Sequence, residues 1–151
     1  MKLLLPYVVR FSLLTFAPLL LVTGCAQTIC LRTVDSANNQ PLSGVSTLWR
    51  EDSAYNLLTE RRHSIGPTNF VSGEQGVITV GEIHNKWVSR FVFSHGGYAT
   101  LYGIYTPGKL VLAERIKPAP LPQDRFILED PRVVVVSSNG CFLVEMKPVS
   151  H

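Results

Sequence analysis

The chain has 151 residues, a formal net charge of +3 at pH 7 and 46% hydrophobic residues, which suits one domain with one core. Its longest basic run is the pair Arg61-Arg62, so it lacks the basic stripe that a nucleic-acid partner requires. The histidines stand singly and match no metal-ligand spacing: His63, His84, His95 and His151. Composition therefore excludes nucleic-acid binding and gives no reason to expect a metal or another cofactor.

An apolar run occupies residues 11–22 and is preceded by two basic residues, Lys2 and Arg10. Twelve residues are too few for a spanning helix, which needs about 20. The length and the basic flank instead predict a cleaved signal peptide.

This run ends in Val22-Thr23-Gly24-Cys25, which resembles the lipobox of bacterial lipoprotein signals. The resemblance implies cleavage after Gly24, lipidation of Cys25 and a short lipidated tether over residues 25–27. A thiol suits this position because its sulfur is the best nucleophile among the side chains near neutral pH. The alternative is an ordinary secretory signal followed by an incidental cysteine. Ala26 resembles the residue at this position in outer-membrane lipoproteins, so we expect a lipid anchor at the outer membrane of a bacterial envelope.

Removal of residues 1–24 would leave 127 residues, with 12 Lys and Arg residues against 11 Asp and Glu. If lipid takes Cys25, the remaining cysteines are Cys30 and Cys141. The compartment beyond the inner membrane is oxidising, so we expect these two to form a disulfide, although two separate buried thiols are the alternative. The bridge would close a loop of about 110 residues, worth at most about 4–5 kcal/mol in chain entropy.

Short segments rich in β-branched and aromatic residues follow one another through the mature chain, separated by turn formers. The expected strands are Ile29–Val34, Val45–Arg50, Val77–Val80, Trp87–Ser94, Tyr98–Tyr105, Lys109–Ile116, Val133–Ser138 and Cys141–Lys147. Seven or eight such strands predict an all-β fold for residues 28–149, an antiparallel β-sandwich of two sheets.

Two strand regions carry a more detailed prediction. Along residues 87–94 the alternation places Trp87, Ser89, Phe91 and Phe93 on one face. Asn139-Gly140 is the pair that a type I′ hairpin requires, since both of its turn residues need positive φ. The four valines of residues 133–136 show no polar alternation, which predicts a strand buried on both faces.

Four ranges do not follow this strand pattern. Ala54–Arg62 is the single helical candidate, and it lacks good caps. Lys117–Pro122 has a proline at every second position, which indicates a stiff connector, with a docking segment for an aromatic groove as the alternative. Residues 53–67 and 106–128 are long connections, which we interpret as extended loops, with a functional surface as the alternative.

Three motifs occur in a familiar order: residues 34–45 (Val-Asp-Ser-Ala-Asn-Asn-Gln-Pro-Leu-Ser-Gly-Val), Thr68 with Gly73–Val80, and Phe93–Tyr98. Together they resemble the opening, turn and Gly-Tyr step of carboxypeptidase regulatory-like, or transthyretin-like, β-sandwich domains. The resemblance implies a non-catalytic module that acts as a spacer, a stabiliser or a binding platform. The two long loops exceed what the family core needs. Our first functional expectation is thus an accessory, scaffold or binding lipoprotein with an envelope protein as partner.

An envelope hydrolase is the enzymatic alternative. Ser94-His95, or His84 with Glu82, could form a nucleophile–base pair. No Gly-x-Ser-x-Gly elbow is present, and lone histidines near strand ends are usually structural. We therefore expect no catalytic residues.

A binding protein for a small ligand or a glycan is the other alternative. Its platform would consist of Trp49, Trp87, Tyr98, Tyr102 and Tyr105. A sandwich core also needs large rings, and we expect these aromatic residues to fill or cap it.

Overall fold

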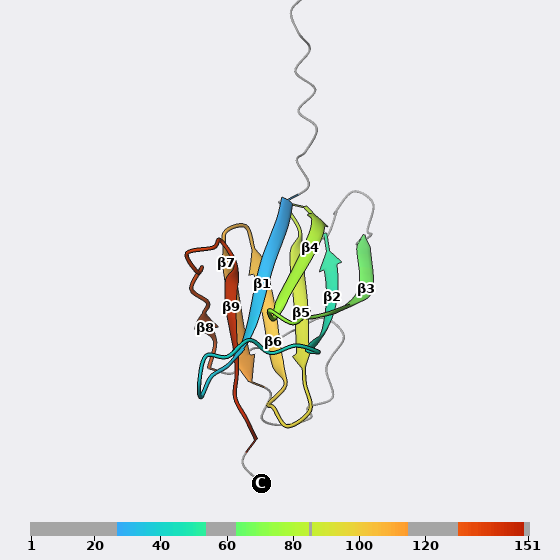
Figure 1. Cartoon of the computed structure of the whole chain (residues 1–151). Coiled ribbons are helices and arrows are strands. Elements are labelled where there is room, and N and C mark those ends of the chain that lie inside the picture. The colour runs from blue at the N-terminus through green and yellow to red at the C-terminus, as the bar shows by residue number, and fades with distance from the viewer. Residues whose placement is uncertain (1–26, 54–62, 85, 115–129, 150–151) are drawn as a thin grey trace, which may run out of the picture.

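The computed structural model describes residues 27–53, 63–84, 86–114 and 130–149. These residues form nine strands (Figure 1). In chain order they are β1 (Gln27–Asp35), β2 (Ser46–Asp52), β3 (Ser64–Val71), β4 (Val77–Ile83), β5 (Val88–Ser94), β6 (Leu101–Thr106), β7 (Lys109–Glu114), β8 (Arg132–Val133) and β9 (Phe142–Met146).

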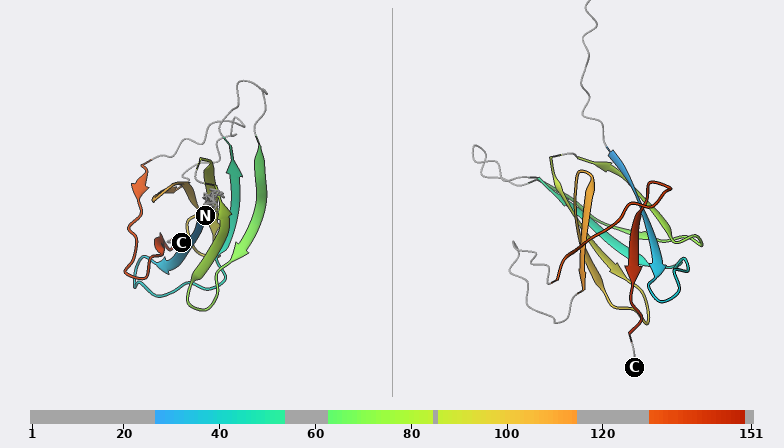
Figure 2. Two further views of the ribbon diagram at one scale, coloured as in Figure 1. Left: turned by 90° about the horizontal axis from the view of Figure 1, so that it is seen from above. Right: turned by 90° about the vertical axis from the view of Figure 1, so that its left-hand side faces the viewer.

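The strands pack as two facing sheets, so the expected all-β sandwich is confirmed (Figure 2). A three-stranded sheet has the order β4-β1-β9, and a six-stranded sheet has the order β3-β2-β5-β6-β7-β8. Every pairing between neighbouring strands is antiparallel except that of β1 with β9, which is parallel. The parallel pairing of β1 with β9 was not predicted. Strand β3 was not predicted either; it lies exposed at the edge of its sheet and contains Gly66-Pro67.

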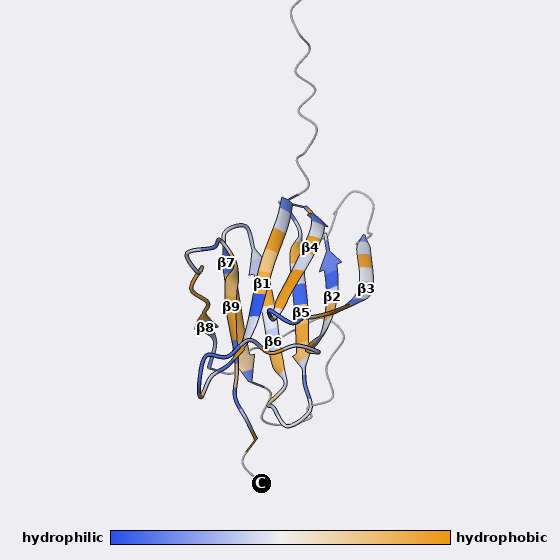
Figure 3. Ribbon diagram, viewed as in Figure 1, coloured by the Kyte–Doolittle hydropathy of each residue, from blue (hydrophilic) through white to orange (hydrophobic). Residues whose placement is uncertain are grey.

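The core lies between the two sheets. Its residues come from strands along which buried and exposed positions alternate, and hydrophobic residues recur along these strands (Figure 3). Ser89, Phe91 and Phe93 lie on one face of β5, as their alternation predicted, and all three are completely buried. Trp87 precedes the strand and is half-buried. From the opposite sheet β1 contributes Leu31. Burying a side chain of this size stabilises the fold by roughly 1.5–3 kcal/mol.

The predicted disulfide is confirmed: Cys30 and Cys141 are joined, with their Cα atoms 4.5 Å apart. The bridge precedes the parallel pair of Leu31 with Phe142 by one residue, so it fastens β1 to β9. A parallel pair needs a long crossover, and here 111 residues of sequence separate the two cysteines. In the chain-entropy model a bridge over this distance is worth at most about 4–5 kcal/mol.

The turn at Asn139-Gly140 exists, but the predicted type I′ geometry is wrong. Gly140 has φ of 77°, while Asn139 is not among the residues with positive φ. The Gly140 N–H donates to the carbonyl of Ser137, and the Ser137 N–H donates to that of Cys141. This pattern is that of a turn closed by a single left-handed glycine. The flanking strands diverge because β8 joins the six-stranded sheet while β9 joins the other.

The prediction that residues 133–136 are buried on both faces is also wrong. Val134 is 8% exposed, whereas Val133, Val135 and Val136 are 61%, 74% and 48% exposed. The reason is position: β8 is only two residues long and lies at an edge of its sheet, where no further strand of the described residues covers it.

The helical candidate 54–62 and the proline-rich residues 117–122 lie outside the described residues. The lipobox and Cys25 do so as well. Within the residues that the structure describes, no helix has the length and apolar character that crossing a membrane would require.

The three motifs that resemble the family meet at the end of the sandwich where β1 finishes, which we call the far end. The Thr33 hydroxyl donates to the carbonyls of Leu42 and Gly76, at 2.9 and 3.0 Å. Ser72 links the same loops, since its hydroxyl donates to Leu42 O and accepts the Val45 N–H. The first and second motifs thus close one end of the core together.

Gly76 lies closest to this junction. Its φ is 70°, and a Cβ built on it would lie 2.3 Å from the carbonyl oxygen of Thr33. The same carbonyl accepts the Leu42 N–H, and the Thr33 N–H in turn donates to Gly76 O at 2.8 Å. A side chain at residue 76 would therefore force two strands apart.

We predict that Gly76→Ala lowers the free energy of unfolding by about 3 kcal/mol or more, because left-handed strain and a backbone clash act together. Gly73→Ala in the same turn is the matched control, since nothing lies within 4 Å of its added Cβ and its φ is not positive. Chemical denaturation of both variants measures the difference. Equal midpoints for the two would contradict this account.

Candidate functional site

The end of the sandwich where β1 begins, which we call the near end, holds a carboxylate inside the core. Alternation along β2 turns Thr47, Trp49 and Glu51 inward, and all three are buried. Glu51 is 0% exposed. A buried carboxyl group is costly unless hydrogen bonds satisfy it, so its partners define the site.

Glu51 binds the crossover turn, residues 84–87, which connects β4 of one sheet to β5 of the other. The backbone N–H of His84 donates to Glu51 Oε1 at 2.8 Å, and His84 Nδ1 lies 2.8 Å from Oε2. The Ser89 hydroxyl donates to Oε1 at 3.4 Å. The Trp87 N–H donates to His84 O, and their rings stack with centroids 4.5 Å apart. The Glu51 side chain of β2 therefore holds in place the turn that carries the chain from one sheet to the other.

This geometry orients an imidazole. With the proton on Nδ1, the carboxylate holds the ring in one tautomer and leaves Nε2 as an acceptor. The His84 side chain is 46% exposed, so a solute can approach it. A nucleophile would have to lie against the imidazole, yet the Ser89 hydroxyl bonds to the carboxylate instead. Ser89 is therefore not placed as a nucleophile on this imidazole.

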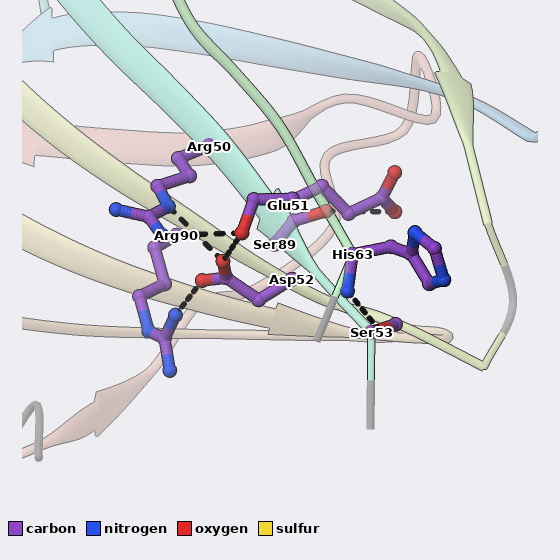
Figure 4. A network of polar contacts seen from close by, with 8 residues as sticks. Arg50, Glu51, Asp52, Ser53, His63, Ser89 and Arg90 are labelled. Atoms are coloured by element: carbon purple, nitrogen blue, oxygen red, sulfur yellow. Dashed lines mark hydrogen bonds and ion pairs between the residues drawn. The ribbon is translucent and has the colours of Figure 1, made fainter. Parts of the chain in front are cut away.

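A second polar network lies beside Glu51 around Asp52 (Figure 4). Asp52 Oδ1 accepts from Arg50 Nε at 3.0 Å and from the Ser64 hydroxyl at 2.7 Å, and Oδ2 pairs with Arg90. The next residue, Ser53, accepts the His63 N–H at 2.9 Å. These contacts join β2, β3 and β5 and pin the edge strand.

The nucleophile–base pairs considered as the enzymatic alternative are not the contacts that these histidines make. The carboxylate partner of His84 is Glu51, not Glu82, which is exposed. His95 contacts the carbonyls of Ser43 and Gly96 at 3.1 Å each. His84 follows β4 at the near end and His95 follows β5 at the far end, so they belong to different sites (Figure 1).

Sequence reasoning missed Glu51. Its expected strand stopped at Arg50, one residue too early to include the carboxylate. The available signal was a charged residue at the next inward position after Thr47 and Trp49.

The five aromatic residues do not form one platform. Trp49 and Tyr105 are core residues, at 5% and 1% exposed, and they pack edge-on against Phe70 and Phe142. The other three rings are half-buried: Trp87 at the near end, Tyr98 at the far end and Tyr102 on β6. The expectation that rings fill or cap the core holds for Trp49 and Tyr105, and for Tyr98, which packs against the core from one end.

Tyr98 closes the far end. Its hydroxyl donates to Asp35 Oδ2 at 3.0 Å, and its ring meets that of His95 edge-on. The hydrogen bond to Asp35 raises the pKa of Tyr98, with smaller contributions from burial and from the negative charge of Asp35. The third family-like motif is thereby tied to the first.

No group of three His, Cys, Asp or Glu residues within the described part of the chain could hold a metal ion. The two cysteines described are both in the disulfide.

Comparison with protein-family models found no match, and comparison with curated proteins found none either. Among solved structures, the chain is similar to the pilus adhesin RrgA from Streptococcus pneumoniae, with a TM-score of 0.50 and 15% sequence identity over 84% of this chain. The match covers 16% of the adhesin, so this chain spans about one sixth of its length. At that identity the likeness shows the fold alone, an all-β architecture.

We predict that Glu51→Gln lowers the free energy of unfolding by about 1–3 kcal/mol, because one acceptor oxygen remains for the donors of His84 and Ser89. Nitrogen NMR should show the His84 ring proton moving from Nδ1 to Nε2, since an amide NH₂ can only donate. Glu82→Gln is the control. Glu82 is an exposed residue of β4, so this change should alter the free energy of unfolding by less than about 0.5 kcal/mol. An unchanged stability and tautomer in Glu51→Gln would refute the assignment.

We also predict an alkaline loss of stability that depends on Tyr98. Its pKa is raised above 10.0 in the folded state, so its contribution is complete below that pH and disappears as the pH rises through the folded-state pKa. Tyr98→Phe should flatten the fall in unfolding free energy above about pH 10. Identical alkaline profiles for wild type and Tyr98→Phe would exclude this role.

Proposed function

We propose that this protein is a non-catalytic, lipid-anchored protein of the bacterial cell envelope, whose sandwich serves as an accessory, scaffold or binding module. The observation that carries the proposal is the placement of the lipobox. Cys25 stands two residues before Gln27, the first residue of β1. An anchor there would hold the folded domain on the membrane. The residue after the cysteine, Ala26, resembles that of outer-membrane lipoproteins and so favours the outer membrane.

The disulfide supports export. Disulfides persist in oxidising compartments and are rare in the cytosol. Cys30 and Cys141 are bridged, which leaves Cys25 as the remaining cysteine of the chain. One cysteine for a lipid and two for a disulfide are what a lipidated N-terminal residue followed by a disulfide-bonded domain would need.

The polar groups considered for catalysis are engaged in holding the fold together. Glu51, His84 and Ser89 join β2 to the crossover turn, and His95 bonds to backbone carbonyls. This use favours a binding or scaffold role over a hydrolase. The likeness to a pilus adhesin concerns the fold alone and adds no partner.

The test is the mass and location of the mature protein. We expect the full chain, expressed with a C-terminal tag in a bacterial host, to enter the membrane fraction without residues 1–24 and with acyl lipid on Cys25. Two or three acyl chains suffice, since each buried methylene contributes about 0.8 kcal/mol. Cys25→Ser should lose the lipid and leave the membrane.

The control is Ala26→Ser, which keeps the thiol and should remain lipidated. A wild-type protein that is cleaved but carries no lipid, or that retains residues 1–24, would overturn the proposal.

A further inference from the structure

The near end of the sandwich surrounds the point where the lipid would be attached. Gln27 begins β1 and pairs with Ile83, the last residue of β4. The crossover turn, residues 84–87, therefore starts beside the attachment point. Tyr105 donates to Gln27 Oε1 at 3.3 Å and accepts the Gly108 N–H at 3.3 Å, so the turn between β6 and β7 lies there too.

The tether is too short to let this end leave the membrane. Cys25 is two residues from Gln27, so their Cα atoms can be at most about 7 Å apart. The headgroup layer on each side of a bilayer is about 5–8 Å thick. A lipid on Cys25 would thus keep the start of β1 within about one headgroup layer of the lipid.

The side chains at the near end suit that environment. Trp87 is half-buried, and its ring stacks on the partly exposed ring of His84. Lys86 on the crossover turn and Lys109 at the start of β7 are exposed, as is Glu82 near the end of β4. The carboxylates of Glu51 and Asp52 at this end are buried and hydrogen-bonded. Tryptophan prefers the membrane–water interface, and lysine stems extend across it while the ammonium groups reach headgroup phosphates.

We propose that the crossover turn docks on the headgroup layer of the membrane, with Trp87 at the interface and Lys86 and Lys109 on lipid phosphates. This inference rests on the lipid anchor of the proposed function and adds an orientation to it. The first and last residues of β1 are eight steps apart, or about 26 Å at 3.3 Å per residue, so the far end would lie up to that distance from the membrane.

Trp87 provides the probe. The chain contains two tryptophans, and Trp49 is buried with an indole N–H that has no hydrogen-bond partner among the described residues. Trp49→Phe should therefore fold and leave Trp87 as the one fluorophore. The matched control carries Trp49→Phe, Trp87→Phe and Ala37→Trp, because Ala37 is exposed in the far-end turn and uses only its backbone N–H.

The two lipidated proteins would be reconstituted into vesicles of phosphatidylethanolamine and phosphatidylglycerol, with part of the lipid carrying a nitroxide near the headgroup. We expect the quencher to remove about half of the fluorescence at Trp87 and little of that at position 37, because only the first lies at the interface. Mass spectrometry of the same samples reports the lipid.

The two proposals fail in different ways. If the mass shows lipid on Cys25 but Trp87 is quenched no more than the far-end tryptophan, the docking is wrong and the lipoprotein assignment stands. If the mass shows no lipid, the proposed function fails and the docking with it.

Discussion

Strand β1 is the constraint on which the rest of the structure depends. It is the central strand of the three-stranded sheet, and each of its segments fixes something different. Gln27 at its start pairs with Ile83 and so sets where the crossover turn leaves β4. Cys30 bridges to Cys141 and holds β9 in parallel register. Thr33 near its end binds the loops that close the far end. A slip of one residue would turn its buried face outward and undo all three.

The buried carboxylate of Glu51 is a second, more local device. Taking a carboxyl group out of water costs free energy, and the hydrogen bonds from His84 and Ser89 offset that cost. An apolar residue would avoid the cost but would not select one path for the crossover turn. The arrangement also leaves the His84 ring partly exposed at the end nearest the start of β1. Glu51 can therefore hold the crossover turn in place while the ring of His84 stays partly exposed to solvent.

The two ends of the sandwich divide the polar groups between them. The near end holds the Glu51–His84 pair and Trp87, and the far end holds Asp35, Tyr98 and His95. Under the proposed anchoring, the near end faces lipid and the far end faces outward. A partner in the envelope would then meet loops that are already fixed to the sandwich by hydrogen bonds, which lowers the entropic cost of binding.

The sequence by itself determined the all-β class and the common face of the alternating residues on β5, because alternation is a local property. The pairing of Cys30 with Cys141 followed once the resemblance to a lipobox set Cys25 aside, because two cysteines allow one connectivity. The sequence did not determine which sheet each strand joins. The valines of residues 133–136 look like a central strand, but β8 lies at an edge, and burial depends on neighbours supplied from elsewhere in the chain. For the same reason only the tertiary structure showed that His84, thirty-three residues from Glu51, is its partner.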